Sequence, residues 1–417
     1  MKLIDFRMED IQTVQKLLKD DIGPVPAMLL EESCPDIGTD DIPRDVFISQ
    51  QYHDLEVENL WKKVWQAAGR EEDIPNVGDH FLYEISDCSV IVIRVAPNEV
   101  RAFHNVCLHR GTQLRVSGGN IRTFQCPFHG WRWNLDGSVN HIPCRWDFEH
   151  VKDDASRLPE VKVNLWQGII FLNFDAQSES LESHLENIPD HFQSIPFPLA
   201  DRFTAIRIIK VMPANWKVTL EAFTESYHFA ATHPQILPFT GFAQYDIYGR
   251  HSRTILPSGV KSPYLDSSMS HQALAEKVAA FEGTDPTTVQ VPEGMTARSY
   301  TAQRARQRLQ AMLGIDTSAL LDTEAIDVMS YWVFPNLILT PSLEFPLFIR
   351  VQPNGNDPDS SLMEVRVMLP CPPGGRPPSA KLQRLSKDEP WSSVPEFNKI
   401  GLVFDQDTAN LERIQRG

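Results

Sequence analysis

Two short segments of this sequence each place a cysteine close to a histidine. The first reads C-L-H-R-G and has Cys107 and His109 two residues apart, and the second reads C-P-F-H-G-W and has Cys126 and His129 three residues apart. Thiolate and imidazole groups are metal ligands, so two short loops that bring four of them together can form one metal site. The ligand set suits either a zinc ion or an iron–sulfur cluster with two irons.

The order of the ligands distinguishes these two kinds of site. Zinc fingers generally pair their cysteines and pair their histidines, whereas here each segment supplies one of each. A two-iron cluster could take both thiolates on one iron and both imidazoles on the other, which is how Rieske [2Fe-2S] centres are ligated. The spacing C-x-H, sixteen residues, C-x-x-H, followed by G-W, resembles the Rieske-domain signature. A structural zinc site is the alternative.

Composition limits the partners that the chain can have. Its 417 residues are too many for one ordinary core, so two or three domains are expected. A net charge of −16 would repel nucleic acid and anionic membranes over much of the surface, so neither is an expected partner. An acidic surface can instead dock a positively charged electron-transfer protein.

The compartment is predicted from apolar runs and from cysteine usage. The N-terminus has no uninterrupted apolar segment typical of a signal peptide, and no apolar run approaches the roughly 20 residues that span a bilayer. Six cysteines in so long a chain do not make a disulfide framework, and two of them already belong to the metal motif. We therefore expect a cytoplasmic protein without a membrane segment.

The first part of the chain is expected to form an arm and an all-β domain. Residues 1–45 are charged and contain several prolines, which predicts an N-terminal arm. Residues 46–178 begin with a predicted helix from Asp54 to Gly69, whose apolar residues have helical spacing. From about 79 to 174 the apolar residues alternate, which predicts short strands with the cysteine–histidine segments in the loops between them.

Residues 179–417 are expected to form the last domain. A strand T-A-I-R-I-I-K-V-M is followed by a predicted long helix from about Asn215 and by a loop-rich section over 240–300, a candidate lid. A helix A-R-S-Y-T-A-Q-R-A-R-Q-R-L-Q-A-M-L, four strand-like runs and a last helix beginning near Asp405 complete the domain. The fold class is therefore α+β.

A second metal site is predicted around two histidines. Glu225 and His228 share one face of a helix, but His233 would lie about 140° further round at 3.6 residues per turn. Pro234 disfavours the α conformation at His233, so the helix should loosen or end there and let that ring turn back. The two histidines could then bind one metal ion.

The third ligand must come from elsewhere in the chain. The segment F-D-Q-D-T offers Asp405 and Asp407 at the predicted start of the last helix. Two histidines and one carboxylate on one face of an octahedron form the facial triad of non-haem Fe(II) oxygenases, which leaves positions open for O₂. The sequence therefore predicts a mononuclear iron site downstream of the cluster motif.

Together the two motifs resemble the α subunit of Rieske non-haem iron oxygenases, the ring-hydroxylating oxygenase family, over about residues 45–417. The resemblance implies an all-β Rieske domain followed by a helix-grip catalytic domain, in which a curved antiparallel sheet and a long helix enclose the iron. The implied ligands are Cys107, His109, Cys126 and His129 for the [2Fe-2S] cluster, and His228, His233 and Asp407 for the iron. Asp407 is preferred to Asp405 because Q-D-T and E-R-I-Q-R-G match the family's ending.

The resemblance also implies a role for Glu225 and a quaternary structure. Glu225 stands at the position of the family's bridging carboxylate, which links a Rieske histidine of one subunit to an iron-binding histidine of its neighbour. A head-to-tail homotrimer follows from that link, with a β subunit as a possible addition. Ala222 departs from the asparagine that relatives often carry, and the chain stops after Q-R-G where many relatives continue, so a tail is expected to be missing.

The implied activity is oxygenation with external electrons. Because the sequence has no dinucleotide- or flavin-binding motif, NAD(P)H is expected to act through a separate reductase or ferredoxin. The predicted reaction is mono- or dihydroxylation of an aromatic or other hydrophobic substrate by O₂, as in the catabolism of aromatic hydrocarbons. Alternatives are oxidative O- or N-demethylation and, outside this class, a Rieske electron carrier or a zinc-stabilised binding protein.

A hydrophobic substrate is favoured by apolar residues around the predicted iron site. The candidate pocket residues are Phe223, Phe229, Leu237 and Leu339, with Phe239, Phe345 and Phe348 as further possibilities. Each of them is also an ordinary candidate for the core.

Overall fold

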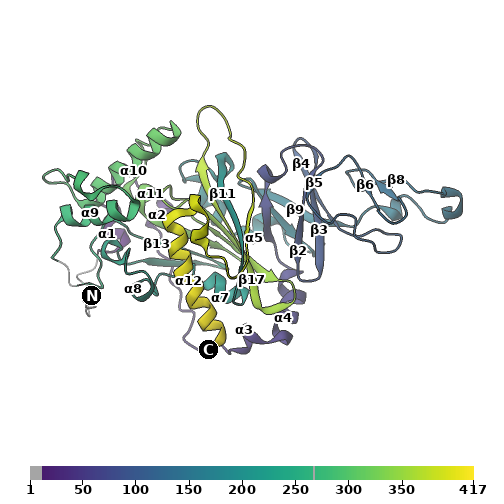
Figure 1. Ribbon diagram of the computed structural model, residues 1–417, viewed down its shortest axis with the longest axis horizontal. Coiled ribbons are helices and arrows are strands. Elements are labelled where there is room, and N and C mark those ends of the chain that lie inside the picture. The colour runs from purple at the N-terminus through teal and green to yellow at the C-terminus, as the bar shows by residue number, and fades with distance from the viewer. Residues whose placement is uncertain (1–11, 266–267) are drawn as a thin grey trace. The chain divides into compact units, whose positions relative to one another are not determined.

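The computed structural model describes residues 12–265 and 268–417 and divides into two compact units (Figure 1). The small unit contains both cysteine–histidine segments, and the large unit contains the predicted iron site. The small unit comprises residues 48–184 and 352–358, and the large unit comprises residues up to 47, 185–351 and 359–417. The first eleven residues of the predicted arm lie outside the described part of the chain.

The small unit is built on one large and one small sheet, which confirms the all-β prediction. The large sheet has the strand order β1-β10-β9-β4-β3-β2-β5, and the small sheet has the order β6-β7-β8. The strands are β1 (Gln66–Arg70), β2 (Asp79–Ile85), β3 (Cys88–Ala96), β4 (Glu99–His104), β5 (Gly119–Asn120), β6 (Phe124–Gln125), β7 (Arg132–Trp133), β8 (Val139–His141), β9 (Glu160–Trp166) and β10 (Ile169–Asn173).

Aromatic side chains attach the small sheet to the large one. Phe103 from β4 and Phe124 from β6 meet edge to face with ring centroids 5.7 Å apart. Trp133 is fully buried in the same cluster, and its indole N–H donates to the carbonyl of Ser156 at 2.8 Å. The segment N-L-D-G, residues 134–137, forms the turn between β7 and β8, with Gly137 at φ +80°. The loops that carry the cysteines and histidines are therefore fixed on a packed core.

The helix predicted from Asp54 to Gly69 is wrong at both ends. Ser49 caps the helix α4 (Gln50–Glu56), which continues as a π-helical turn (Val57–Trp61), and the chain then enters β1. The apolar residues of β1 pair with β10 in the sheet. Strand pairing thus overrode a local pattern that also suited a helix.

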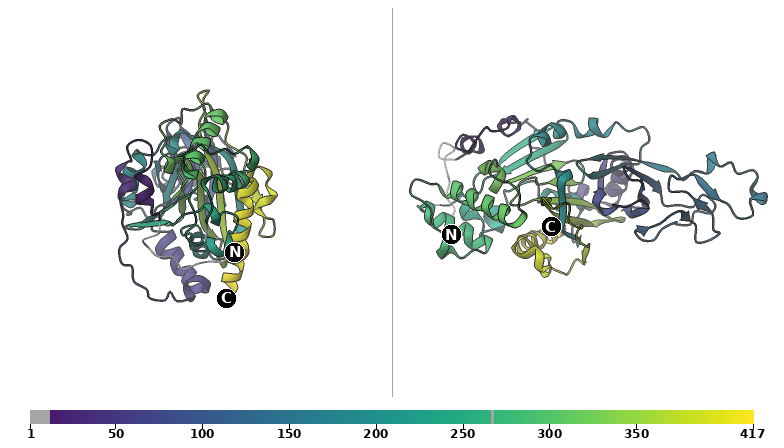
Figure 2. Two further views of the ribbon diagram at one scale, coloured as in Figure 1. Left: turned by 90° about the vertical axis from the view of Figure 1, so that its left-hand side faces the viewer. Right: turned by 90° about the horizontal axis from the view of Figure 1, so that it is seen from above.

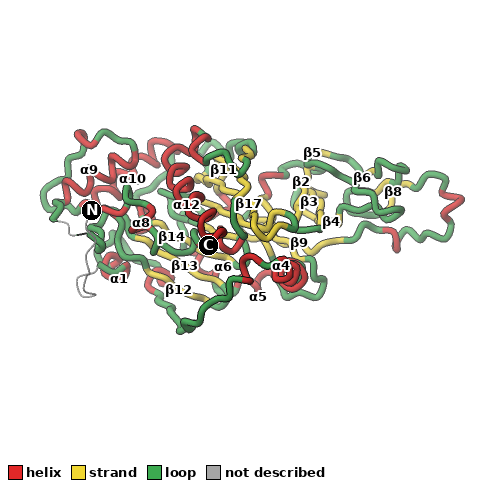
Figure 3. The backbone as a smooth tube through the Cα atoms, turned by 60° about the horizontal axis from the view of Figure 1, so that its bottom comes forward, coloured by secondary structure: helices red, strands yellow, loops and turns green. Residues whose placement is uncertain are grey.

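The large unit contains an eight-stranded sheet, and Figure 3 shows β12, β13 and β14 side by side in it. Its strand order is β12-β13-β14-β15-β16-β17-β11-β18. The strands are β11 (Arg202–Met212), β12 (Gln244–Tyr248), β13 (His251–Leu256), β14 (Val328–Val333), β15 (Leu337–Leu339), β16 (Leu347–Asn354), β17 (Asp357–Pro370) and β18 (Gln383–Leu385). The predicted strands are confirmed, but β18 runs parallel to β11 at one edge of a sheet that was expected to be antiparallel throughout.

Helices accompany this sheet. The longest of them, α12 (Asn398–Arg416), crosses one face of the sheet in Figure 1. The helices α9 (His271–Glu282) and α10 (Ala297–Leu313) lie beside each other in Figure 1 and, in green, in the right-hand view of Figure 2. The other helices are α1 (Val14–Leu18), α2 (Ala27–Leu30), α3 (Asp45–Ile48), α5 (Leu181–Leu185), α6 (Ile188–Gln193), α7 (Trp216–Glu221), α8 (Phe229–Thr232), α9 (His271–Glu282), α10 (Ala297–Leu313) and α11 (Asp322–Ile326). None of the helices among the described residues has the length and apolar character to cross a membrane.

Two predictions for this unit need correction. The last helix begins at Asn398, so Asp405 lies inside it and not near its start. The long helix expected from Asn215 ends after six residues, and the long helix of the fold is α12. The section 240–300 contains many loop residues, as expected, and it also contributes β12, β13 and the twelve-residue helix α9.

Candidate metal centres and active-site cavity

The two cysteine–histidine segments have the same backbone frame. In Cys107–Gly111 and in Cys126–Gly130, the glycine N–H donates to the cysteine carbonyl, at 2.9 and 3.1 Å. Each cysteine N–H in turn donates to the carbonyl that follows the glycine, at 2.8 and 2.9 Å. Both glycines have φ +76°, a conformation that a residue with a Cβ rarely adopts. The sequence thus builds two matching turns that differ in the position of the histidine.

These turns bring the four predicted cluster ligands to one place. The rings of His109 and His129 have centroids 4.6 Å apart, and His109 stacks on Trp131 at 5.1 Å with 7° between the planes. Cys107 and Cys126 are buried and hydrogen-bonded to each other. Burial opposes ionisation of Cys126, but the backbone N–H groups of His129 and Phe128 outweigh it and lower the pKa of the thiol.

One buried atom among these four side chains indicates which group the site would bind. Nδ1 of His109 is buried and has no hydrogen-bond partner among the described residues. A buried nitrogen without a partner costs about 1–3 kcal/mol, unless a ligand satisfies it. Two thiols, two imidazoles and backbone N–H groups directed at sulfur are the groups that a two-iron, two-sulfide cluster requires. The residues therefore fit a [2Fe-2S] centre.

The predicted iron site lies in a break between two short helices. Asn215 caps α7 by accepting a hydrogen bond from the Lys217 N–H at 3.0 Å, and α7 ends at Glu221. The helix α8 then occupies only the four residues between His228 and His233. The backbone at His233 leaves the helical region, at φ −121° and ψ 61°, which confirms that the helix ends before Pro234.

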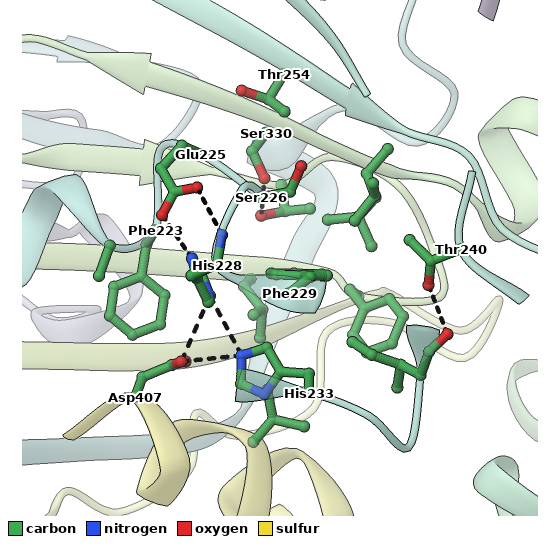
Figure 4. Close-up of a pocket in the computed structure, with 18 of the residues that line it drawn as sticks. Phe223, Glu225, Ser226, His228, Phe229, His233, Thr240, Thr254, Ser330 and Asp407 are labelled. Atoms are coloured by element: carbon green, nitrogen blue, oxygen red, sulfur yellow. Dashed lines mark hydrogen bonds and ion pairs between the residues drawn. The ribbon is translucent and has the colours of Figure 1, made fainter. Parts of the chain in front are cut away.

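Three predicted ligands converge in this break (Figure 4). Nε2 of His228 lies 3.2 Å from Nε2 of His233. Oδ1 of Asp407, from α12, lies 2.9 Å from Nε2 of His233 and 3.5 Å from Nε2 of His228. One donor atom from each of the three residues lies within 4.8 Å of the other two, so one metal ion could contact them all.

The hydrogen bonds of the two Nδ1 atoms determine which ring nitrogen of each histidine faces the other ligands with room for a metal ion. Nδ1 of His228 faces Oε1 of Glu225 at 2.5 Å, and Nδ1 of His233 faces Oε1 of Gln406 at 2.8 Å. Because each of these oxygens only accepts, both Nδ1 atoms carry a proton, which leaves the two Nε2 atoms as the places for a second proton or a metal ion. The two Nε2 atoms and the Asp407 carboxylate then meet at one place, an arrangement that suits a bound cation.

The surroundings of His233 support the same conclusion. Its side chain is fully buried, and burial opposes its protonation. The carboxylate of Asp407 outweighs burial and raises the pKa of His233 above its ordinary value. A proton or a metal ion on Nε2 therefore balances the buried negative charge.

Unlike Asp407, Asp405 has a structural role. Its carboxylate accepts hydrogen bonds from the backbone N–H groups of Trp391, at 2.6 Å, and Ser392, at 3.2 Å, and from the Ser392 hydroxyl at 2.6 Å. These contacts attach α12 to the 3-10 turn Trp391–Ser393. The geometry thus supports the preference for Asp407 over Asp405.

A cavity of about 160 Å³ adjoins the three converging side chains. Among the described residues that line it, aromatic and aliphatic side chains predominate, there is no lysine or arginine, and several serines and threonines contribute hydroxyls. The phenylalanines that line it are Phe223, Phe229, Phe239, Phe281, Phe345 and Phe404. The hydroxyl residues are Thr224, Ser226, Thr240, Thr254, Ser258, Ser330 and Thr340.

The structure separates the predicted pocket residues into two groups. Phe223 and Phe229 line the cavity, as expected, whereas Leu237 and Leu339 are buried elsewhere. The reason at Leu339 is the alternation of a strand: its neighbours Ile338 and Thr340 face the cavity, so Leu339 faces the opposite side. The same alternation excludes Phe348, which lies between two lining residues of β16.

Sequence reasoning missed the hydroxyl residues and Gln406. The serines and threonines carry no motif, but the alternation along β13, β14 and β15 could have placed several of them on one face. No local signal distinguishes Gln406 from the other polar residues of α12.

Comparisons with known proteins agree with this geometry. Residues 64–152 match a family model described as the Rieske [2Fe-2S] domain. Residues 187–417, more than half of the chain, match a model described as the ring hydroxylating alpha subunit (catalytic domain).

Curated relatives include oxygenases of two kinds. The oxygenase subunit of carnitine monooxygenase from Escherichia coli K12 is 29% identical over 245 residues, which are 58% of this chain and 64% of that protein. The alpha subunit of biphenyl 2,3-dioxygenase from Rhodococcus jostii is 29% identical over 196 residues, which are 45% of this chain and 42% of that protein. The chain thus aligns with less than two thirds of the length of either relative.

Solved structures show the same fold. The quaternary ammonium Rieske monooxygenase CntA in complex with L-carnitine superposes with a TM-score of 0.63 and 18% identity, over 90% of this chain and 84% of that one. Naphthalene 1,2-dioxygenase from Rhodococcus sp., bound to indole, gives a TM-score of 0.59 and 21% identity, over 90% and 82%. Identities this low support the fold alone.

Proposed function

Since the chain belongs to the family of ring-hydroxylating alpha subunits, we propose that it is the terminal component of a Rieske oxygenase. The observation that carries this proposal is the meeting of three possible ligand atoms, from His228, His233 and Asp407, beside an apolar cavity. Cys107, His109, Cys126 and His129 would hold the [2Fe-2S] cluster. When bound, the cluster supplies single electrons, and the mononuclear iron supplies the activation of O₂.

The protein groups around the iron site then have defined tasks. His228 and His233 present Nε2 lone pairs because Glu225 and Gln406 hold their Nδ1 protons. Glu225 is only half-buried. Burial raises its pKa, but the contact with the His228 ring and the backbone N–H groups of Tyr227 and His228 together outweigh burial and lower the pKa. The Glu225 carboxylate therefore stays charged at the outer edge of the site. The phenylalanine-rich lining excludes water from the reacting region.

The cavity favours a compact, uncharged and largely apolar substrate. An apolar cavity of about 150 Å³ takes up one benzene ring, so about 160 Å³ suits a molecule with one ring. The hydroxyls of Ser330 and Thr340 face each other at 3.5 Å and could bind one polar substituent. Without a lysine or arginine among the described lining residues, a substrate carboxylate would have no counter-charge. We therefore favour hydroxylation of a small aromatic compound.

Oxidation of a quaternary ammonium compound is the second candidate. The relatives named carnitine monooxygenase and glycine betaine monooxygenase support it. The six phenylalanines of the lining could contact a trimethylammonium group through cation–π interactions. This candidate corresponds to an N-demethylation, and substrate binding decides between the two.

Electron supply is proposed to come from a separate ferredoxin or flavin reductase that uses NAD(P)H.

Apolar side chains at the tips of both cluster turns, Leu108 and Phe128, are exposed, and Arg110 lies over the Phe128 ring at 5.9 Å. Tyr227, beside Glu225, is also exposed. We propose that these surfaces meet between subunits of a homotrimer, with Glu225 as the bridge. A cytoplasmic location and an additional β subunit stay predictions.

Metal and sulfide analysis of anaerobically purified protein tests the proposed centres first. We expect about three irons and two sulfides per chain. Zinc without sulfide would contradict the whole proposal, and two irons with two sulfides would leave the cluster but contradict the second site.

The His228→Ala variant should retain the cluster absorbance and lose product formation with reductase, NADH and O₂. Full activity of that variant would contradict the assignment.

Substrate class is tested by binding to the reduced protein. We expect toluene-sized neutral aromatics to perturb the spectrum of the ferrous site, and carnitine and glycine betaine to leave it unchanged. The reverse result would favour the quaternary ammonium candidate.

Sedimentation velocity of the wild type and of Phe128→Glu tests the subunit contact, because a buried charge at that tip should dissociate the trimer.

A further inference from the structure

Gln406 forms a hydrogen bond with His233, one of the proposed iron ligands, at the ring nitrogen that does not face the metal site. Its side-chain oxygen accepts the Nδ1 proton of His233 at 2.8 Å. Gln406 lies on α12 directly before Asp407, while His233 follows the short helix α8. The segment that supplies the carboxylate ligand therefore also orients the imidazole opposite to it.

A second contact fixes the amide of Gln406. The side-chain amide of Gln235 donates to the same oxygen at 2.7 Å, and the amide of Gln406 returns a longer bond to Gln235 at 3.4 Å. An amide that receives two donors on its oxygen has a defined orientation. The oxygen is therefore kept toward His233, and the imidazole is kept in the tautomer that leaves Nε2 free.

The two histidines differ in the charge of their supporting groups. His228 is held by the carboxylate of Glu225, and His233 by the neutral amide of Gln406. One divalent cation balances Asp407 and Glu225, so a third carboxylate beside the fully buried His233 would leave negative charge without a partner. A neutral acceptor satisfies the Nδ1 proton without that cost.

We infer that Gln406 is a positioning residue of the mononuclear metal site, which fixes the tautomer and the ring orientation of His233. It does not touch the metal or the substrate. Groups of this kind typically change metal affinity 10- to 100-fold when they are removed. This role deepens the proposed function and rests on it.

The test uses the full chain with its cluster in place, after removal of iron from the mononuclear site by a chelator. Co(II) is titrated into this protein, and its d–d absorption bands report both affinity and ligand geometry. We expect Gln406→Leu, which has similar volume but no acceptor, to weaken Co(II) binding about 10- to 100-fold and to change the bands. Gln406→Glu retains the acceptor oxygen, so it should keep the wild-type bands and bind Co(II) more tightly than Gln406→Leu, while its added buried charge should lower the stability of the metal-free protein.

A matched control is available on the same helix. The amide of Asn410 donates to the hydroxyl of Thr232 at 3.1 Å, so it joins α12 to the segment beside His233 without contact to the ring. Asn410→Ala should therefore leave Co(II) affinity and spectrum unchanged. A merely structural effect would instead give Asn410→Ala and Gln406→Leu the same loss, and that result would overturn the role of Gln406.

The remaining outcomes are also decisive. Wild-type affinity and bands in Gln406→Leu would overturn the inference while leaving the proposed metal site intact. A wild-type protein that binds no Co(II) would overturn the proposed function itself. Where Gln406→Leu does not fold, Gln235→Ala replaces it, because this exposed residue only orients the amide and its loss should weaken Co(II) binding in the same direction. Unchanged binding in that variant would count against the inference.

Discussion

Asp407 and His233 contact each other although they lie near opposite ends of the catalytic sequence, with Oδ1 of Asp407 2.9 Å from Nε2 of His233. The contact depends on the rotational phase of α12. Residues two positions apart on an α-helix differ by about 200° around the axis, so Asp405 and Asp407 must face different ways. Asp407 faces the histidines, and Asp405 faces the turn at Trp391 and Ser392.

Substitution of the two aspartates should therefore have different effects. Asp407→Asn removes the anionic ligand, and we expect loss of the mononuclear iron and of activity with an unchanged cluster spectrum. Asp405→Asn weakens the bonds to Trp391 and Ser392, and we expect a loss of about 1–3 kcal/mol in the free energy of unfolding with iron retained. Iron analysis and denaturant unfolding measure both effects. Loss of iron in the Asp405 variant alone would contradict the assignment.

Alternation at β15 predicts a second contrast. Ile338→Phe adds volume on the side that faces the cavity, so substrate affinity should fall at least tenfold while iron content stays unchanged. Leu339→Ala truncates a fully buried side chain on the opposite side, so it should cost about 2–5 kcal/mol of stability with little effect on substrate affinity. Equilibrium binding and denaturant unfolding measure the two variants. Interchanged effects would show that the register is wrong.

Glu364 predicts a large effect on folding. Its buried carboxylate receives Arg207 at 2.8 Å and Arg350 and Arg366 at 2.7 Å each, and these arginines hold its pKa far below the usual range despite burial. Glu364→Gln would leave these cations without their shared anion, so we expect a loss of about 3–5 kcal/mol in stability.

The control for this variant is an exposed ion pair. Glu412 contacts Arg416 at 2.6 Å on the surface of α12, and Glu412→Gln should change stability by less than about 1 kcal/mol. Both variants are compared by denaturant unfolding at neutral pH. Equal effects would contradict the importance of burial.

Glu344 predicts a dependence of stability on pH. Burial raises its pKa to about 7, although Arg308 lowers it in part. Because the folded state then holds this proton more tightly than the unfolded chain, wild-type stability should fall as the pH rises from about 4.5 to 7. Glu344→Gln lacks this titration.

The stability of Glu344→Gln relative to the wild type should therefore increase by on the order of 2 kcal/mol between pH 5 and pH 8. Denaturant unfolding at several pH values measures the difference. Parallel curves for the two proteins would contradict the raised pKa.

The sequence was informative where chemistry is carried by close neighbours. The cysteine–histidine segments need only a five-residue turn with a glycine at its end, and the structure has that turn twice. His228 and His233 are similarly close, and Pro234 indicated where the helix ends. The strands of the two large sheets were also visible in their alternation, because one face of each is buried.

Other features depended on contacts between distant segments. The stretch Gln66–Arg70 continues a helical pattern, but it pairs with β10 and is a strand. The phase of α12 against α8 selected Asp407 and brought Gln406 to His233, and no local pattern contains that phase. Which apolar residues line the cavity was likewise decided by strand register, as Leu339 and Ile338 show.

The sequence by itself therefore determined the types of ligand, their short-range spacing and the alternation of the strands, since these follow from backbone geometry over a few residues. Only the tertiary structure decided which carboxylate joins the histidines, which acceptor holds each ring and which side chains line the cavity. These depend on the packing of one helix and on the register of paired strands, and both are set by the free energy of burying the whole core.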